Sequence, residues 1–241
     1  LHGVELRLGT VADFESLQDF DEVVLATGVT PRTPDIEGID HDKVVSYVDV
    51  LTGGVQPGKR VAIIGAGGIG FDVAEFLGDD LPDDETTEPH PPSVEEFAQQ
   101  WGIDLNLEAR GGVQGIKAEP AELVREIWLL QRKTSKPGKG LGKTTGWIHR
   151  LSLRKRGVTM MGGVSYRRID DQGLHITQGD DEKLLDVDHI VVCAGQLPRR
   201  DLQEPLEQSG IGVHLIGGAD VATELDAKRA IKQGSELAAA F

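Results

Sequence analysis

The stretch "KRVAIIGAGGIGFDVAEFLG", residues 59–78, places a glycine-rich turn between two apolar segments of different period. The β-branched run Val61–Ile64 predicts a buried strand, and the apolar spacing from Gly68 to Gly78 predicts an amphipathic helix. The turn fits G-x-G-x-x-G, whose glycines allow a tight turn, close approach of backbone to a pyrophosphate, and close packing of helix on strand. This context predicts a dinucleotide-binding fold and disfavours a purely structural turn. The residues expected at the phosphates are Gly65, Gly67, Gly68 and Gly70.

The second strand of such a fold carries the groups that select the dinucleotide. An acidic residue there binds the ribose of NAD, whereas basic residues bind the 2′-phosphate of NADP. The expected position, roughly 20 to 30 residues after the first glycine, falls in an acidic, proline-rich stretch, so residues 79–125 are predicted to be an insertion. The second strand is then "EIWLLQ", residues 126–131, followed by Arg132 and Lys133. This basic pair predicts NADPH as the nicotinamide cofactor.

Charge is unevenly distributed along the chain. The 40 Asp and Glu against 25 Lys and Arg give a net charge of −15, which disfavours a nucleic-acid-binding protein. Residues 127–169 nevertheless contain eleven Lys and Arg and no Asp or Glu. A solvated helix face would explain Arg154–Arg156 but not the lysines of the preceding loop, so we interpret this window as an anion site.

Several classes of protein are disfavoured by what the sequence lacks. The single cysteine, Cys193, excludes a disulfide framework and an iron–sulfur cluster built by this chain alone, and it favours a reducing, cytoplasmic location. We interpret Cys193 as a small core residue. Apolar runs are too short for a membrane span, and the first residues do not resemble a signal peptide. Because the sequence starts with Leu1 rather than Met, we expect it to begin inside a longer reading frame.

No chemistry beyond cofactor binding can be assigned from residue spacing. The seven histidines form no metal-ligand pattern, and no nucleophile can be paired with a base, so neither metal ligands nor catalytic residues are expected. The segment "PGKGLGKTT", residues 137–145, resembles a phosphate-binding P-loop, but Pro137 stands where that motif has its first glycine. An NTPase is therefore disfavoured.

Two stretches of the chain are nearly the same. "DFDEVVLATGVTPR" (19–32) and "DVDHIVVCAGQLPR" (186–199) align without a gap, and each predicts a buried strand that ends at a glycine beside a cofactor, Gly28 and Gly195. The second copy closes the unit that Gly65 opens. Only 18 residues precede the first copy, too few for a strand, glycine loop, helix and second strand, although residues 4–8 alternate like a strand.

We therefore predict an α/β fold in which a Rossmann-like NADPH-binding domain is inserted in an incomplete FAD-binding domain. The predicted parts are a partial FAD-binding domain (1–29), a connector (30–57), the NADPH-binding domain (58–195) and a return to the FAD-binding domain (196–241). The two crossovers between the domains are expected at 29–35 and 195–201.

The nested arrangement resembles the two-dinucleotide flavoproteins, and the tail "VHLIGGADVATELDAKRAIKQG" (213–234) resembles their terminal FAD motif. By that resemblance Gly28, Gly218 and Asp220 would contact FAD, with Asp220 at its ribityl or pyrophosphate region. The N-terminus of the last helix, at Ala227, would face the isoalloxazine ring.

The segments "GKRVAIIGAGGIGFDVAEFL", "LLQRKTSKPGKGLGKTTGWIHR" and "GVTMMGGVSYRRIDDQGLHI" closely resemble the C-terminal part of the bacterial NADPH-dependent 2,4-dienoyl-CoA reductase family. The resemblance implies a larger enzyme with an FMN-bearing TIM barrel and a four-cysteine iron–sulfur cluster, in which electrons pass from NADPH through FAD and the cluster to FMN. This chain lacks the barrel, the cluster cysteines and the first FAD glycine loop. FMN, the cluster and the acyl-CoA substrate are therefore expected only in the missing part.

Two other functions stay open at this point. One is a related enoate reductase or amine-oxidising enzyme with the same layout of barrel, cluster and FAD domain. The other is an NADP-binding module with no chemistry of its own. In all three cases the chain alone is not expected to complete a substrate reduction.

Overall fold

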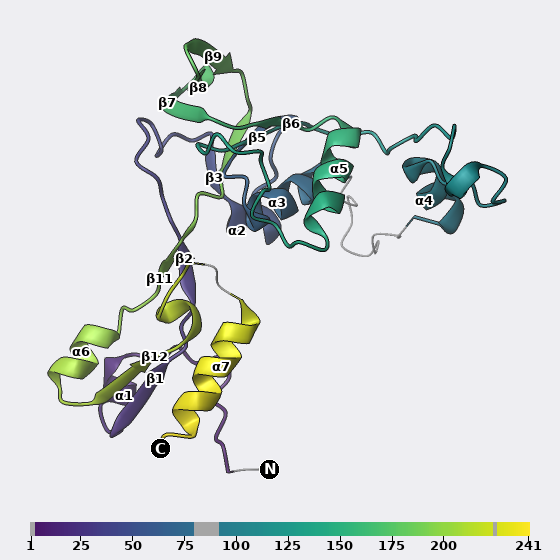
Figure 1. Ribbon diagram of the computed structural model, residues 1–241. Helices are drawn as coiled ribbons and strands as arrows, with labels where there is room; N and C mark the ends of the chain where they lie inside the picture. The colour runs from purple at the N-terminus through teal and green to yellow at the C-terminus, as the bar shows by residue number, and fades with distance from the viewer. Residues whose placement is uncertain (1–2, 80–91, 224–225) are drawn as a thin grey trace. The chain divides into compact units, whose positions relative to one another are not determined.

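A computed structural model describes residues 3–79, 92–223 and 226–241. The chain divides into two compact units, Thr33–Ala194 and the pair of segments Leu1–Arg32 and Gly195–Phe241 (Figure 1). We call these the inserted unit and the terminal unit and describe each by itself.

The inserted unit is built on a five-stranded parallel sheet, which confirms the predicted α/β fold. Its strands follow the order β3-β10-β4-β5-β6. The pairing of β4 with β5 confirms that the second strand follows the insertion, as the sequence predicted. The strands are β3 (Val44–Ser46), β4 (Arg60–Ile64), β5 (Glu126–Leu130), β6 (Thr159–Met161) and β10 (His189–Val192).

Alternate residues of β4 enter two different cores. Val61 and Ile63 pack with the helical layer, whereas Ala62 and Ile64 pack with an antiparallel three-stranded sheet on the other face (Figure 1). Because both faces are covered, the strand is a continuous apolar run rather than an alternating one. The helices are α2 (Tyr47–Leu51), α3 (Gly68–Gly78) and α5 (Gly146–Arg156), and the antiparallel strands are β7 (Val164–Asp170), β8 (Gly173–Gln178) and β9 (Asp181–Leu185).

The predicted insertion is only partly within the described residues, because 80–91 lie outside them. Its remainder holds the helix α4 (Val94–Trp101) and the short 3₁₀ helix η1 (Arg110–Gly112). Ser93 and Glu96 form a capping box at the start of α4, as the polar residues before an apolar run allow. Lys155 of α5 places its Nζ 4.7 Å from the centroid of the Trp101 ring and so connects α4 to the rest of the unit.

The terminal unit contains two small sheets. β1 (Glu22–Leu25) pairs in parallel with β12 (Gly212–Leu215), and β2 (Val29–Pro31) pairs antiparallel with β11 (Gln196–Pro198). A small core of Val23, Leu25, Leu206 and Ile211 lies beneath β1 and β12. The helical segments of this unit are α1 (Phe14–Leu17), α6 (Gln203–Gln208), η2 (Gly217–Ala219) and α7 (Ala227–Ala238).

The tails of the two repeated stretches pair with each other. Arg32 N–H donates to the carbonyl of Gly195 at 3.0 Å, and Arg199 N–H donates to the carbonyl of Gly28 at 3.1 Å. Gly28 aligns with Gly195, and Arg32 aligns with Arg199. The two hydrogen bonds are therefore equivalent, because each joins the arginine N–H of one copy to the glycine carbonyl of the other. The β2–β11 ribbon therefore has an internal pseudo-twofold relation that follows from the sequence repeat.

Two predictions about segments need correction. Residues 4–8 form no strand; they are exposed and pair with no strand among the described residues. The stretch 30–57, expected to be a connector, contains β3 and α2 as well as most of β2. The three-residue strands are too short to give a periodic signal, and their neighbouring prolines and glycines favour a loop.

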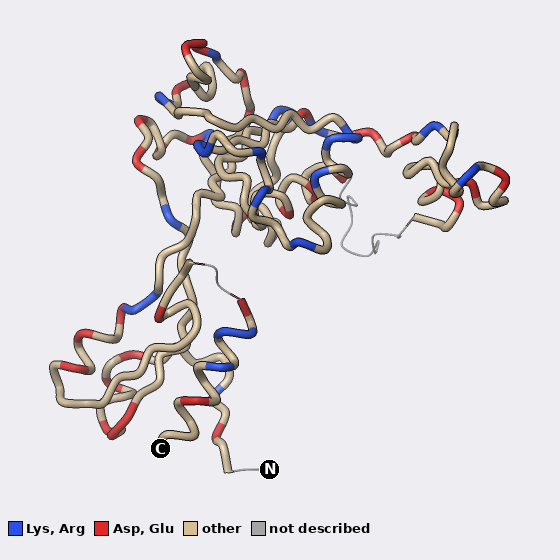
Figure 2. The backbone as a smooth tube through the Cα atoms, in the orientation of Figure 1, with Lys and Arg blue, Asp and Glu red and all other residues tan. Residues whose placement is uncertain are grey.

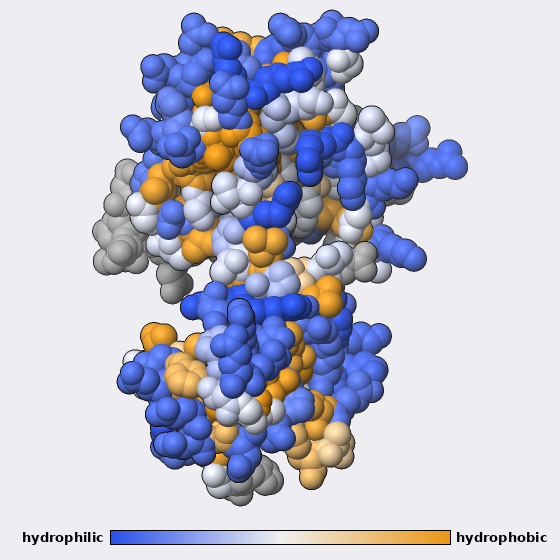
Figure 3. Space-filling model, turned by 90° about the vertical axis from the view of Figure 1, so that its left-hand side faces the viewer, coloured by the Kyte–Doolittle hydropathy of each residue, from blue (hydrophilic) through white to orange (hydrophobic). Residues whose placement is uncertain are grey.

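The surface of each unit shows mainly hydrophilic residues on the face drawn in Figure 3, with hydrophobic residues between them. Within the described ranges, no helix has the length and apolar character needed to cross a membrane.

Candidate functional site

The glycine loop lies where β4 ends and α3 begins. Gly65 has φ +118°, and a Cβ there would overlap the carbonyl oxygen of Cys193 on the neighbouring strand end. A Cβ at Gly70 would overlap the carbonyl of Gly65 itself. Both positions therefore require glycine for close packing of turn, helix and sheet.

Gly67 and Gly68 face open space instead. No atom lies within 4 Å of a Cβ built at either position, and no side chain caps the start of α3 at Gly67. We call this open space at the uncapped, positive end of α3 the cradle. Such a cradle fits the pyrophosphate of a dinucleotide, so the residues present are compatible with the predicted cofactor.

The turn after β5 lies next to this cradle. Gly65 N–H donates to the carbonyl of Leu130 at 2.9 Å, which fixes the glycine loop to the end of β5. Arg132 and Lys133 follow directly; both are exposed, and neither makes a hydrogen bond or ion pair through its side chain within the described part of the chain. The carboxyl ends of the parallel strands thus bring the basic pair and the glycine loop to one edge of the sheet, where cofactors bind in such folds.

The eleven basic residues of the window divide into two groups. Some are engaged by the protein: Arg150 donates to the carbonyl of Gly138 at 2.7 Å, Arg156 pairs with Asp79 at 2.7 Å, and Arg168 pairs with Asp170. The side chains on the loop between β5 and α5 make no ion pair among the described residues, and Figure 2 shows this clustering of Lys and Arg in the inserted unit. These loop residues are Arg132, Lys133, Lys136, Lys139 and Lys143.

Cys193 is buried directly after β10. Burial raises the pKa of its thiol to about 12, so the thiol stays protonated near neutral pH. Tyr166, on β7, also has a raised pKa because of burial, an effect that the nearby charge of Arg132 opposes. Neither group is activated as a nucleophile or base.

The predicted flavin residues lie in the terminal unit. A Cβ at Gly218 would come within 2.7 Å of Val29 Cγ1 and 3.0 Å of the carbonyl carbon of Gly28, so the two glycine segments pack closely. Asp220 Oδ2 accepts from Gln233 Nε2 at 2.6 Å, while Oε1 of the same glutamine accepts from Gly217 N–H at 2.8 Å. Gln233, which sequence reasoning missed, thereby fixes this loop to α7.

The N-terminus of α7 begins at Ala227 and is capped by the protein itself. Asp226 accepts from the N–H of Arg229 at 2.7 Å. Gly195 also falls in the terminal unit, although it had been predicted to contact NADPH with the glycine loop of the inserted unit. The structure thus brings Gly28 and Gly218 together and fixes the Gly65–Gly70 loop to Leu130, two residues before Arg132.

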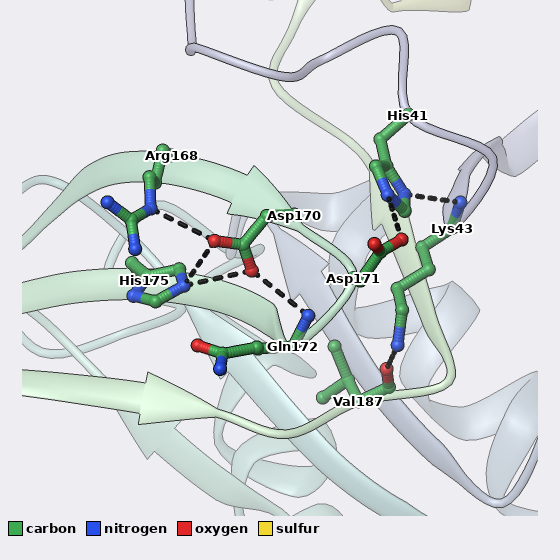
Figure 4. Close-up of polar contacts among 8 residues, drawn as sticks. All are labelled: His41, Lys43, Arg168, Asp170, Asp171, Gln172, His175 and Val187. Atoms are coloured by element: carbon green, nitrogen blue, oxygen red, sulfur yellow. Dashed lines mark hydrogen bonds and ion pairs between the residues drawn. The ribbon is translucent and has the colours of Figure 1, made fainter.

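A separate cavity of about 560 Å³ lies on the antiparallel sheet, lined mainly by Glu37, Arg167, Arg168, His175, Glu182 and Lys183. Two of its basic side chains share one carboxylate neighbour, Asp170. Asp170 accepts from Arg168 Nε and His175 Nε2, each at 3.0 Å, and holds these two side chains together (Figure 4). Nearby, Lys43 Nζ donates to the carbonyl of Val187 at 2.7 Å.

One polar contact of the cavity joins two strands: His175 of β8 bonds to Asp170 of β7. The cavity's arrangement was not visible in the sequence, because a register shift between Tyr166 and Arg168 decides which arginines share a face. Across the described ranges, no three His, Cys, Asp or Glu side chains gather as metal ligands.

Comparison with known proteins gives a consistent family. A family model described as "Pyridine nucleotide-disulphide oxidoreductase" matches residues 5–228. A metal reductase of Desulforamulus reducens is 25% identical over 225 residues, 90% of this chain and 31% of that protein. A cinnamate reductase of Clostridium sporogenes is 47% identical over 77 residues, 31% of this chain and 11% of that protein.

Among solved structures, a 2-naphthoyl-CoA reductase in complex with 2-naphthoyl-CoA has a similar fold. Its TM-score is 0.72 at 24% identity, and the match covers 98% of this chain and 29% of the other. The chain therefore spans about a third or less of the length of each of these proteins.

Proposed function

This chain belongs to the pyridine nucleotide-disulphide oxidoreductase family, and from that premise we propose that it is the electron-input module of a flavoprotein reductase that takes NADPH. The family binds FAD and a nicotinamide dinucleotide. One observation supports the proposal for this chain: the glycine loop with its open cradle is hydrogen-bonded to the end of β5, and the exposed cations Arg132 and Lys133 lie in the turn that follows.

The proposed roles in the inserted unit follow from charge and shape. Gly65 and Gly70 hold the turn close to the sheet, and the open N–H groups at Gly67 and Gly68 bind the pyrophosphate. Arg132 and Lys133 bind the 2′-phosphate, a charge that NADH lacks. When bound, the nicotinamide cofactor supplies a hydride for reduction of the flavin.

In the terminal unit we propose that Gly28, Gly218 and Asp220 contact FAD. Gly218 packs closely against Gly28 and the side chain of Val29, and the bond from Gln233 holds the carboxylate of Asp220 in place. The N-terminus of α7 at Ala227 would direct its positive helix dipole at the flavin. The Asp226 side chain already caps this end by accepting from the N–H of Arg229.

We further propose 2,4-dienoyl-CoA thioesters as substrates of the whole enzyme, based on the resemblance of the segments around residues 58–77 and 129–176. Because the chain covers 31% of the metal reductase and 29% of the 2-naphthoyl-CoA reductase, we propose that the thioester is reduced in a part of the whole enzyme that this chain does not cover. A reductase of related fold is named for an acyl-CoA, which is compatible with the proposal.

The test is direct titration of the purified chain with NADPH and NADH, followed by fluorescence or calorimetry. We expect NADPH to bind at least tenfold more tightly. Arg132→Ala should weaken NADPH binding roughly tenfold or more and NADH binding less than twofold, since a hydrogen bond to a charged group is worth about 1.5–3 kcal/mol.

The matched control is Arg154→Ala, which removes an exposed arginine of α5 that has no ion pair among the described residues. It should leave both affinities unchanged. Equal binding of the two cofactors by the unmodified chain would contradict the NADPH assignment.

An enoate reductase is the second candidate, favoured by the cinnamate reductase relative. The two candidates differ in the substrate of the whole enzyme. Turnover of a 2,4-dienoyl-CoA but not of free cinnamate by the full-length protein would favour the first, and the reverse result would favour the second.

A further inference from the structure

We propose that Gln131 is a positioning residue that holds the Arg132–Lys133 turn in its phosphate-binding shape and so determines the preference for NADPH. This inference rests on the proposed function and names the residue on which its cofactor selectivity depends.

Gln131 directly follows the last residue of β5, Leu130, and precedes the turn. Its backbone N–H donates to the carbonyl of Met161 at 2.9 Å, and its own carbonyl accepts from Val164 N–H at 3.0 Å. The side chain then turns back on the following residues. Its Nε2 donates to the carbonyl of Lys133 at 2.9 Å and also to the carbonyl of Ser135.

The turn between β6 and β7 also packs against the carbonyls of Lys133 and Ser135. Gly163 N–H donates to the carbonyl of Lys133 at 2.9 Å. A Cβ at Gly162 would lie 2.9 Å from the Ser135 oxygen and 3.2 Å from the Lys133 oxygen. The carbonyls therefore face inward, and the side chains of Arg132 and Lys133 are exposed.

Loss of the amide would release this turn without touching the pyrophosphate cradle. The glycine loop is fixed separately, by Gly65 N–H on the carbonyl of Leu130 and by its own close packing. A released turn has to be ordered again when it binds a phosphate, which lowers affinity only for ligands that carry the 2′-phosphate. The two cofactors, which share all other groups, should thus respond differently.

The experiment measures four ligands by calorimetry on the whole chain: NADPH, NADH, 2′,5′-ADP and 5′-AMP. Gln131→Met keeps the length of the side chain and removes its donor. Gln131→Glu is the second variant; it replaces only the NH₂ group, and the position is partly exposed, so a carboxylate is tolerated by the fold. Gln99→Met is the matched control, since it removes an amide that bonds Glu119 in the predicted insertion.

Both Gln131 variants should weaken NADPH and 2′,5′-ADP roughly tenfold and change NADH and 5′-AMP less than twofold, while Gln99→Met changes none of them. Retention of the NADPH preference in folded Gln131→Met or Gln131→Glu, when Arg132→Ala abolishes it, would overturn this inference and leave the proposed function intact. Equal weakening of all four ligands would also overturn it, since Gln131 would then be a general structural residue. No preference in the unmodified chain would instead overturn the proposed function.

Discussion

At the scale of single residues, the glycines of the loop divide into two that the fold needs, Gly65 and Gly70, and two that face open space, where we propose that the cofactor binds. A Cβ at Gly70 meets the carbonyl of Gly65, whereas a Cβ at Gly67 meets nothing. Gly70→Ala should lower the free energy of unfolding by about 1–3 kcal/mol, the usual cost of overpacking. Gly67→Ala should keep the melting temperature and weaken NADPH and NADH alike. Thermal unfolding and titration of both variants check this contrast; a destabilised Gly67→Ala would contradict it.

The ion pairs of Arg60 give a pH dependence to the opposite end of the sheet. Arg60 donates to Asp188 at 2.8 Å, and its backbone N–H donates to the same carboxylate at 2.9 Å. These bonds hold the pKa of Asp188 below its ordinary value of 3.8. A carboxyl whose pKa is lower in the folded state stabilises the fold above its ordinary pKa, and this contribution is lost as the pH falls through the folded value.

Asp188→Asn should therefore lower the stability at pH 7 by about 1 kcal/mol, allowing for partial exposure, and flatten the loss of stability below about pH 4. Denaturant unfolding between pH 2 and pH 7 measures both effects. Asp35→Asn is the control, an exposed aspartate of the inserted unit with no ion pair among the described residues. An unchanged acid limb in Asp188→Asn would show that other carboxyls dominate.

Individual residues were predictable where a motif fixed them. The roles of Gly65 and Gly70 in packing follow from the spacing of the loop, and the burial of Cys193 follows from its place in an apolar run. Gln131 and Gln233 were not predictable, because an amide that bonds backbone carbonyls or a neighbouring carboxylate has no characteristic spacing. Such contacts depend on how segments approach in space.

At the scale of elements, α4 is linked to α5 by a basic side chain. Lys155 lies over the ring of Trp101 and also donates to its carbonyl at 3.4 Å. Lys155→Met should raise hydrogen exchange in residues 94–101, with a cost below about 1 kcal/mol for the exposed cation–π contact. NADPH affinity should stay the same, and Arg154→Met should alter neither. A weaker affinity in Lys155→Met would contradict a purely local role.

The sequence predicted elements well where the apolar pattern was long and bounded. β4, α3 and β5 matched their predicted ranges closely, even across the insertion, because each is buried against the sheet core. The alternating pattern of residues 4–8 gave a wrong prediction of a strand. Such a pattern makes a strand only when a neighbouring strand supplies hydrogen bonds to its backbone. The short β3 was missed because pairing with β10, not propensity, defines it.

At the scale of the whole molecule, the inserted unit has its own core on each face of its parallel sheet, and it contains the glycine loop and the Arg132–Lys133 pair. Its sheet is covered by helices on one face and by β7–β9 on the other. Residues 33–194 alone should therefore fold cooperatively and bind NADPH within about twofold of the whole chain, since a domain with its own core can fold independently. Melting and titration of the excised unit measure this. The excised unit carrying Arg132→Ala is the control, and equal binding by both would contradict the assigned site.

The β2–β11 ribbon also determines how the chain responds to a pulling force. Residues 3 and 241 both belong to the terminal unit, and the two crossings to the inserted unit are hydrogen-bonded to each other. Tension applied between these residues first reaches β1, β12 and the small core around them. It then opens the ribbon from the Val29–Pro198 pair inward, one pair at a time. We expect the sheet that carries the glycine loop to bear load only after the β2–β11 pairs have separated. It should therefore be the part of the molecule that unfolds last under tension.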